Sequence, residues 1–440
     1  MQTILELEIE VLKEQEGSCF EVPFEMPENV AEMEVQYSYP HFVTEEDEAG
    51  NSYIEEKSII DLALVDKNKN HLGSSGSNRS SITISEFYSS DGYSTTPMDT
   101  GEWGIVVGAY KVSSPGIKVS YKIIFTLRER CLIKGDLHTH TNGSDGSFSI
   151  DEIKQRACEN DLDFVFITDH NNYIQNDYLR PAKDIVMLPG VEWTNFKGHI
   201  NMLGAKRAYE GSFYANSLEE MQAKVAEAKK NGAIISINHP FCPECGFEWG
   251  LENVDFDAIE IWNGPIIKPR EIDAINWWQK KLCQGEQVVA LAGSDFHRNE
   301  LGRDVGLPTT YLYSYSKAPS DIYQSIRNGN AFLTIAPNDV TVDMQCQEKI
   351  IGETVEVSGS ASCKIVFKKL KAGDKICLIT DLECEELQVQ KSYTEYTCEK
   401  MVKNEKFIRV EVHRRLIPSL PTQIVLLSNP IYFRKKELDD

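Results

Sequence analysis

Two pairs of residues in this sequence have the types and the spacing of metal ligands. His138 and His140 are separated by one residue, as are Asp295 and His297. In an extended segment, residues i and i+2 point to the same side, so each pair can direct two ligands at one ion. The spacing therefore predicts a metal site to which both pairs contribute.

Further residues of these types stand at the ends of predicted strands. They are His170 after the run 163–168, Glu192 at the end of 185–192, and His239 after 233–237. Enzymes with parallel barrel strands carry their chemistry at the C-terminal strand ends. A single such histidine is more often a core residue, but buried titratable groups are costly unless they are paired or metal-bound. The set as a whole therefore predicts metal binding.

The elements that must position these residues alternate between strand and helix from Cys131 to about Pro337. Capping boxes at Ser149–Glu152 and Ser217–Glu220 open two predicted helices. Such alternation is typical of βα units with parallel pairing, and several units in about 200 residues favour an α/β barrel.

The chain has 440 residues, which is long enough for further domains besides this barrel. Residues 1–130 consist of short alternating runs, which predict an N-terminal β-sandwich or jelly-roll domain. The metallohydrolase barrel is expected over residues 131–337. Residues 338–440 become β-rich again and predict a small C-terminal β-sandwich domain.

The charge and hydropathy of the chain limit the classes of partner that it is expected to bind. A formal net charge of -23 argues against a long nucleic acid, which needs a basic surface. No apolar run approaches the roughly 18 residues of a membrane span, and the start of the chain lacks the pattern of a secretory signal. We therefore expect a cytoplasmic protein with a small-molecule substrate and no membrane partner. The oligomeric state is left open.

Cys242 and Cys245 form a CxxC motif just after His239. A structural zinc site usually needs a second pair at matching spacing, and the sequence has none. A plain loop is therefore favoured over zinc or redox use, and its position leaves room for a wall of the active site.

Six segments together resemble the motifs of the PHP (polymerase and histidinol phosphatase) metallohydrolases, in the same order. They are Gly135–Thr141, Ser144–Gly146, Ile167–His170, Pro189–Glu192, Asn238–Pro240 and Gly293–His297. The likeness covers about residues 131–337. The β-rich N-terminal part, which leads directly into the first motif, also resembles the CehA/McbA-like branch of these proteins.

The resemblance implies a distorted seven-stranded βα barrel with two to three divalent ions, and the mixed ligands suit Zn²⁺, Mn²⁺ or Fe²⁺. By position, His138, His140, Glu192 and Asp295 would hold the first ion. Glu192 would bridge to the second ion, which His199 and His239 would also hold. Asp145, His170 and His297 would hold the third, although some family members have a histidine near position 145. A surface histidine is the alternative for His199.

The predicted activity is hydrolysis of a small phosphorylated metabolite or nucleotide by a metal-bridging hydroxide, because such ions lower the pKa of bound water. Glu192, Asp295 and His297 are the predicted catalytic residues, and either of the last two could relay a proton to the leaving oxygen. The candidates for binding phosphate are Lys197, Arg298 and Arg303, each of which could equally be an exposed solvated charge.

Two other functions remain open from the sequence. The same chemistry could cleave carboxyl esters, carbamates or amides, as the CehA/McbA likeness suggests. Alternatively, the chain could be a non-catalytic metal-binding scaffold, although a decayed site usually loses ligands and this one is complete.

Overall fold

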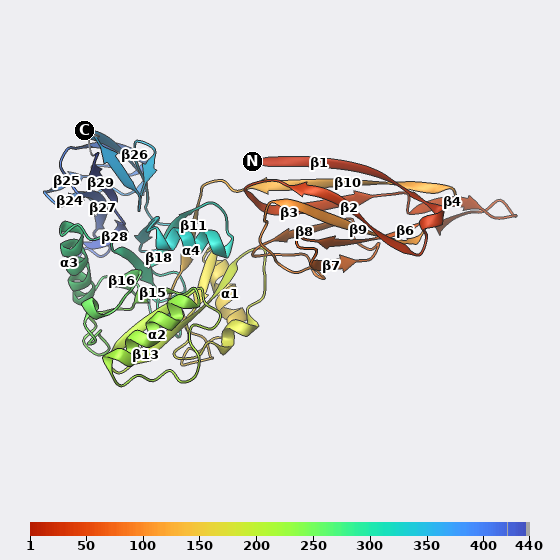
Figure 1. Ribbon diagram of the computed structural model, residues 1–440. Helices are drawn as coiled ribbons and strands as arrows, with labels where there is room; N and C mark the ends of the chain where they lie inside the picture. Colours follow the sequence, from red (N-terminus) through yellow and green to blue (C-terminus); the bar gives the residue numbers. More distant parts are fainter. Residues whose placement is uncertain (420, 437–440) are drawn as a thin grey trace. The chain divides into compact units, whose positions relative to one another are not determined.

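The computed structural model describes residues 1–419 and 421–436, and the chain divides into two compact units (Figure 1). One unit comprises Met1–Arg130 with Pro181–Lys183, and the other comprises Cys131–Arg180 with the chain from Asp184 onward. Over the described residues the protein is mixed α/β, with one large mixed sheet and few helices. None of the described helices is both long and apolar enough to cross a membrane.

The first unit is built from ten strands. They are β1 (Gln2–Leu12), β2 (Ser18–Met26), β3 (Val30–Ser38), β4 (Phe42–Glu46), β5 (Ser52–Glu56), β6 (Ile59–Val65), β7 (His71–Ser75), β8 (Ser81–Ser85), β9 (Gly101–Lys111) and β10 (Gly116–Leu127). Eight of them form two four-stranded sheets, in the orders β1-β10-β3-β8 and β2-β9-β6-β7. Buried side chains alternate along β3 and β10, as expected when one face of a sheet covers a core. Trp103 and Tyr121, one from each sheet, belong to the same buried cluster.

The second unit contains the predicted metal ligands. Its elements through residue 334 are β11 (Cys131–Asp136), α1 (Ile150–Glu159), β12 (Phe164–Ile167), β13 (Val186–Asn195), β14 (Gly198–Leu203), α2 (Leu218–Lys230), β15 (Ile234–Ile237), β16 (Ala258–Asn263), α3 (Pro269–Cys283), β17 (Val289–Gly293), β18 (Thr309–Ser314), α4 (Pro319–Arg327) and β19 (Ala331–Thr334). Ser149 caps α1 as predicted: its Oγ accepts from Glu152 N at 3.3 Å, and Glu152 Oε2 accepts from Ser149 N at 2.8 Å.

One 15-stranded sheet organises this unit, with the order β17-β16-β15-β14-β13-β12-β11-β18-β19 through its first part. The β11–β12–β13 and β15–β16–β17 pairs are parallel, whereas β14 runs antiparallel to both neighbours. Thr310 on β18 accepts from Ala292 N and donates to Ala292 O on β17, at 3.3 and 2.9 Å. These bonds link one end of the strand order to a strand inside it. The closed seven-stranded barrel stays a prediction.

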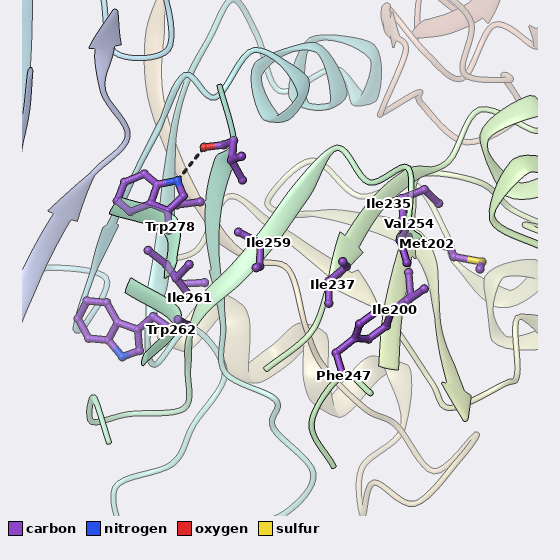
Figure 2. Close-up of a cluster of buried hydrophobic side chains, with 14 of the residues drawn as sticks. Ile200, Met202, Ile235, Ile237, Phe247, Val254, Ile259, Ile261, Trp262 and Trp278 are labelled. Carbon is purple, nitrogen blue, oxygen red and sulfur yellow. Dashed lines mark hydrogen bonds between the residues drawn. The ribbon is translucent and has the colours of Figure 1, made fainter. Parts of the chain in front are cut away.

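Apolar side chains behind β14, β15 and β16 hold these strands in place (Figure 2). Ile200, Ile237 and Ile259 have no exposed surface and pack in one cluster with residues of α2 and α3. Trp278 of α3 is also fully buried, and its Nε1 donates to Val288 O at 2.8 Å. Because interiors pack at crystal-like density, this cluster holds the strands that carry the predicted ligands in fixed positions.

The rest of the chain continues the same unit. Its strands are β20 (Thr341–Cys346), β21 (Lys349–Ile350), β22 (Thr354–Val357), β23 (Ala361–Leu370), β24 (Lys375–Thr380), β25 (Cys384–Gln388), β26 (Tyr393–Val402), β27 (Phe407–Arg414), β28 (Gln423–Ser428) and β29 (Ile431–Lys435). β28 pairs with β19, so the large sheet crosses residue 337, where we expect a domain boundary from the sequence. Arg409 lies 4.9 Å from the Trp278 ring and donates to Gln279 Oε1 at 2.7 Å. Residues beyond 337 therefore share both a sheet and side-chain contacts with the preceding region.

Candidate metal centre

All nine predicted metal ligands lie in one connected network of side chains. Most stand just beyond strand ends, as the sequence predicts: His138 and His140 follow β11, His170 follows β12, His239 follows β15, and Asp295 and His297 follow β17. Each of the nine has a nitrogen or oxygen within 3.7 Å of a donor atom of another member. The structure thus brings together residues that are separated by up to 159 positions in the chain.

Glu192 and His199 reach the centre differently from the prediction. The strand carrying Glu192 does not end there, because β13 continues to Asn195 and turns directly into β14. In this antiparallel hairpin Thr194 is paired with His199. The hairpin returns the chain to the site, so His199 enters from a strand beside the one that carries Glu192.

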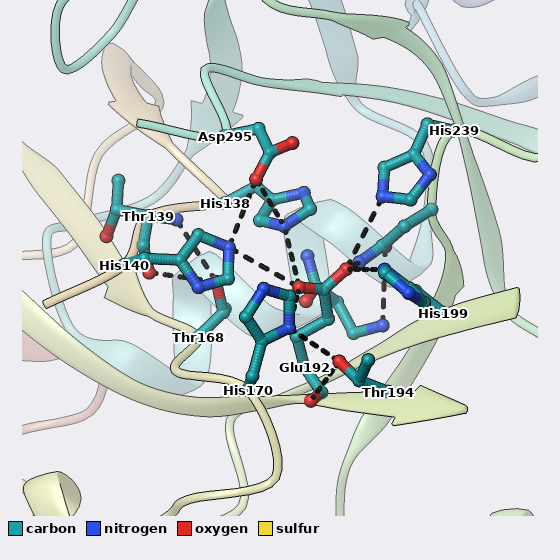
Figure 3. A network of polar contacts seen from close by, with 12 residues as sticks. His138, Thr139, His140, Thr168, His170, Glu192, Thr194, His199, His239 and Asp295 are labelled. Atoms are coloured by element: carbon teal, nitrogen blue, oxygen red, sulfur yellow. Dashed lines mark hydrogen bonds and ion pairs between the residues drawn. The ribbon is translucent and has the colours of Figure 1, made fainter. Parts of the chain in front are cut away.

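The Glu192 carboxylate lies at the middle of the network and is fully buried (Figure 3). Its Oε2 is 2.8 Å from His170 Nδ1 and 3.4 Å from Nε2 of both His138 and His140, and its Oε1 is 3.0 Å from His199 Nδ1 and 3.5 Å from His239 Nε2. The two oxygens thus face different histidines. This is the arrangement that a carboxylate needs in order to bridge two cations.

Several buried nitrogen and oxygen atoms of this network, each able to bind a metal ion, have no hydrogen-bond partner among the described residues. They include Nε2 of His138 and of His140, together with Glu192 Oε2. Both nitrogens also approach Asp295 Oδ1, at 3.2 and 3.1 Å. A buried polar atom without a partner costs about 1–3 kcal/mol. Cations of the kind that imidazole and carboxylate bind would satisfy these atoms, so the residues fit a metal centre.

A second cluster of potential ligands opens toward solvent. His140, Asp145, His170 and His297 offer ligand atoms that lie within 4.8 Å of one another. Asp145 Oδ1 is 3.3 Å from His297 Nε2 and 3.7 Å from His170 Nε2. The Asp145 side chain is 54% exposed, unlike the buried Glu192. This side of the centre is therefore the more accessible one.

Partners of the outer ring nitrogens fix the orientation of two histidines. His297 Nδ1 lies 2.8 Å from Asp295 O, and since a carbonyl can only accept, Nδ1 carries the proton. His138 Nδ1 is likewise held 3.0 Å from Glu260 Oε1. In both rings this directs Nε2 into the centre, where it can bind a cation once the ring is neutral, as metal-binding histidines require.

Glu260 is a buried residue beside the predicted ligands that the sequence analysis did not single out. Besides holding His138, its Oε2 accepts from His239 N and from Asn263 Nδ2, each at 3.0 Å. One buried carboxylate thus positions two of the predicted ligands. A single charged residue in the apolar run Ala258–Trp262 was the available signal, because a buried charge must be paired.

Two aspartates inside the recognised motifs have positioning roles that were also not predicted. Asp136 accepts from His138 N and Ser294 N, at 3.1 and 3.0 Å, and from Gly306 N at 2.7 Å. Burial raises the pKa of Asp136 to about 6, although these backbone N–H groups oppose the rise. The other residue, Asp169, accepts from Thr141 and Ser144 and fixes the loop that carries Asp145.

The backbone is strained and crowded where it passes the centre. His239 and Asp295 have positive φ angles of 27° and 51°. Such conformations cost about 1–3 kcal/mol in a non-glycine residue and cluster at functional sites. At Gly293 an added Cβ would lie 2.3 Å from His138 Cβ, so only glycine allows β17 to approach this closely.

The charges of the network balance one another. Burial opposes ionisation of Glu192 and Asp295, but the neighbouring histidines outweigh it and hold the pKa of both carboxyls well below the usual range. Burial would likewise lower the pKa of His138, yet Asp295, Glu260 and Glu192 raise it well above its ordinary value. In the absence of cations, protons on the histidines whose pKa is raised, which are His138, His170 and His239, therefore compensate the carboxylates. Cation binding must displace them.

The three candidate phosphate-binding residues lie in different places. Lys197 is exposed on the β13–β14 turn, and its Nζ is 4.7 Å from the centre of the Trp249 ring. Arg298 donates to Asp145 O at 3.3 Å, which places it beside the accessible cluster. Arg303 forms an ion pair with Glu300 at 3.2 Å.

The CxxC motif borders the centre. Cys242 and Cys245 have their Sγ atoms 2.9 Å apart, and Cys245 Sγ lies 3.5 Å from His239 Nδ1. Arg270 Nη1 donates to Cys242 Sγ at 3.2 Å. A guanidinium at this distance disfavours a separate cation between the thiols, and the motif serves as a wall beside His239.

Comparisons with known proteins give short or distant similarities. No protein-family model matches the chain. The DNA polymerase/3'-5' exonuclease PolX of Bacillus subtilis (strain 168) is 33% identical over 90 residues, which are 20% of this chain and 14% of that protein. The chain thus spans about a seventh of the length of this curated relative.

Two solved structures are similar to parts of the chain. One is a two-domain protein from Bacteroides vulgatus ATCC 8482, described as containing a predicted PHP-like metal-dependent phosphoesterase, with TM-score 0.41, 17% identity, and coverage of 69% of this chain and 96% of that one. The other is an amidohydrolase from Chromobacterium violaceum, with TM-score 0.30, 17% identity, and coverage of 38% and 89%. The PHP resemblance therefore rests on the motifs of the sequence, and the CehA/McbA-like branch stays a prediction.

Proposed function

We propose that this chain is a PHP-type, metal-dependent phosphoesterase that hydrolyses a small phosphorylated compound at the centre around Glu192. The observation that carries the proposal is the position of the Glu192 carboxylate, whose two oxygens face different sets of histidines. Centres with two or more cations are suited to phosphoryl transfer, because they neutralise charge on both the attacking and the leaving oxygens.

The ligands divide around Glu192 in a way that supports more than one cation. His138, His140 and Asp295 would hold one cation, and His199 and His239 a second, with Glu192 shared between the two. Asp145, His170 and His297 would hold a third on the accessible side. Divalent ions bound there would supply Lewis acidity and would lower the pKa of water.

The chain's own residues supply orientation and proton transfer. Glu260 and the Asp295 carbonyl hold the rings of His138 and His297 so that each Nε2 keeps its lone pair. The Asp295 side chain is 20% exposed and approaches His138 and His140, so it is the candidate for relaying a proton to the leaving oxygen. Arg298, beside Asp145, is the candidate for contacting the phosphoryl oxygens.

The test is a panel of three p-nitrophenyl compounds with protein loaded with Mn²⁺ or Zn²⁺. These are p-nitrophenyl phosphate, bis-p-nitrophenyl phosphate and p-nitrophenyl acetate, assayed with the unmodified protein, Glu192→Gln and Glu411→Gln. Glu411 is a buried carboxylate of β27 that accepts from Arg409 and contacts His413, so it controls for the loss of a buried charge.

We expect turnover of a phosphate compound by the unmodified protein and by Glu411→Gln, and at least a 100-fold loss in Glu192→Gln, because removal of one preorganised electrostatic group commonly costs this much. Turnover of the acetate alone would replace the proposal with carboxyl-ester or carbamate hydrolysis. No turnover of any compound with either metal would favour a metal-binding scaffold.

A further inference from the structure

A pocket with aromatic walls opens beside His199, and neither the metal centre nor the proposed mechanism uses it. It has a volume of about 450 Å³, within the size range of small-molecule sites. His199 lines the pocket and also contacts Glu192 at 3.0 Å. A group bound in the pocket would therefore lie next to the ligands of the centre.

The pocket walls carry aromatic side chains that are unusually exposed. Phe196 in the β13–β14 turn is fully exposed, and Phe213 and Tyr214, which also line the pocket, are 45% and 60% exposed. Single exposed apolar residues are ordinary, but a group of aromatic rings around one pocket marks a binding site. Trp249 also lines the pocket but is only 6% exposed.

Hydrogen bonds fix these walls in place. Asn195 Nδ2 donates to Ala215 O at 2.9 Å, and Trp193 Nε1 donates to Phe213 O at 2.5 Å, which ties the 213–215 segment to β13. On the other side, Glu248 N donates to Lys197 O at 2.7 Å. The aromatic side chains are therefore exposed on an anchored backbone, which lowers the entropic cost of binding.

The chemistry of the lining selects a planar ring. The exposed rings of Phe196, Phe213 and Tyr214 offer faces for stacking. Lys197 Nζ, 4.7 Å from the centre of the Trp249 ring, adds a cation that interacts with electron-rich rings and with anions. An extended aliphatic chain would use neither property.

We propose that this pocket binds the planar aromatic part of the substrate while the metal centre binds its phosphoryl group. The proposal rests on the proposed phosphoesterase function and adds the substrate class, a phosphoester of a ring-bearing compound. A nucleobase and a simple aryl group share this chemistry, and they differ in size and in polar edges.

Binding of two matched pairs of probes to the metal-loaded protein tests the proposal by calorimetry. One pair is phenylphosphonate and methylphosphonate, and the other is adenosine 5'-monophosphate and ribose 5-phosphate. Within each pair both members carry the same phosphonate or phosphate group, and only the first member has an aromatic ring. We expect the ring-bearing member of at least one pair to bind about tenfold tighter, as stacking on aromatic side chains provides. The pair with the larger ratio distinguishes an aryl group from a nucleobase.

Substitutions locate the effect. Phe213→Ala with Tyr214→Ala should bring the ratio close to one and leave the dissociation constants of methylphosphonate and ribose 5-phosphate unchanged. Phe196→Ala should reduce the ratio in a variant whose folding does not depend on the exposed side chain. Tyr178→Ala, which removes a 59% exposed aromatic residue outside the pocket lining, is the control.

Ratios near one in the unmodified protein would overturn the proposal, as would a full ratio in all the pocket variants. Failure of the phosphoesterase function would look different, because neither p-nitrophenyl phosphate nor bis-p-nitrophenyl phosphate would be hydrolysed, whatever the binding ratios. The hydrolysis rates of phenyl acetate and methyl acetate, each normalised to its rate with hydroxide in solution, would then decide the subsite by the same comparison.

Discussion

Replacing Glu260 with glutamine should weaken metal binding although Glu260 is not itself one of the proposed metal ligands. The carboxylate receives His138 Nδ1 on one oxygen, and His239 N and Asn263 Nδ2 on the other. An amide can accept on one side only. If its oxygen keeps His239 and Asn263, its NH₂ group faces His138 Nδ1. That ring must then carry its proton on Nε2, the atom directed into the centre.

The opposite amide orientation is no better. The NH₂ group would then face the His239 N–H and the Asn263 amide, and donors would meet donors. Loss of a group that orients a metal-binding histidine typically costs 10- to 100-fold in metal affinity. This corresponds to about 1.4–2.7 kcal/mol of binding free energy. We expect Glu260→Gln to fall in this range.

Competition with a fluorescent zinc chelator measures the effect directly, with no need for a substrate. Glu411→Gln is the matched control, because it also neutralises a buried carboxylate in the same unit but contacts Arg409 and His413. The control should bind zinc like the unmodified protein. Equal zinc affinity in Glu260→Gln and the unmodified protein would refute the role of Glu260 in orienting His138.

Two further predictions concern stability. Burial opposes ionisation of Glu411, but Arg409 and His413 lower its pKa to about 2. Because this pKa is depressed in the folded state, the ionised carboxylate contributes at most about 3 kcal/mol to the free energy of unfolding at pH values above the ordinary carboxyl pKa. This contribution is lost as the pH falls from about 4.5 to 2. Urea unfolding at pH 7 and pH 3 should show a smaller pH dependence in Glu411→Gln, and an unchanged dependence would contradict this. Gly293→Ala places a Cβ 2.3 Å from His138 Cβ and should destabilise the protein by about 1–3 kcal/mol and weaken zinc binding. Wild-type melting temperature and zinc affinity would show that β17 does not need this close approach.

The residues of the centre were predictable where chemistry and local pattern coincide. His138 and His140 follow a predicted strand with a spacing that brings both to one side, and the same holds for Asp295 and His297. Such signals are local and require no knowledge of the partner strand. His199 was harder to place, because its position depends on the antiparallel hairpin that it forms with the strand of Glu192.

Contacts between residues that lie far apart in the sequence have no comparable local pattern. Glu260 has its partners at His138 and His239, which are 122 and 21 positions away, and nothing in the run Ala258–Trp262 indicates either one. Pairing of β19 with β28 likewise joins segments about 90 residues apart, so the sequence predicted a separate C-terminal domain where the sheet continues. Strand partners are set by packing and register across the whole unit.

Anomalous diffraction from crystals soaked with Zn²⁺ or Mn²⁺ tests the central claim most directly. We predict at least two peaks, one beside each oxygen of the Glu192 carboxylate and each at about 2.0–2.2 Å from that oxygen. In Glu192→Gln, at least one of these two peaks should be lost. A Glu192 carboxylate that contacts only histidines and water at full metal concentration would contradict the account.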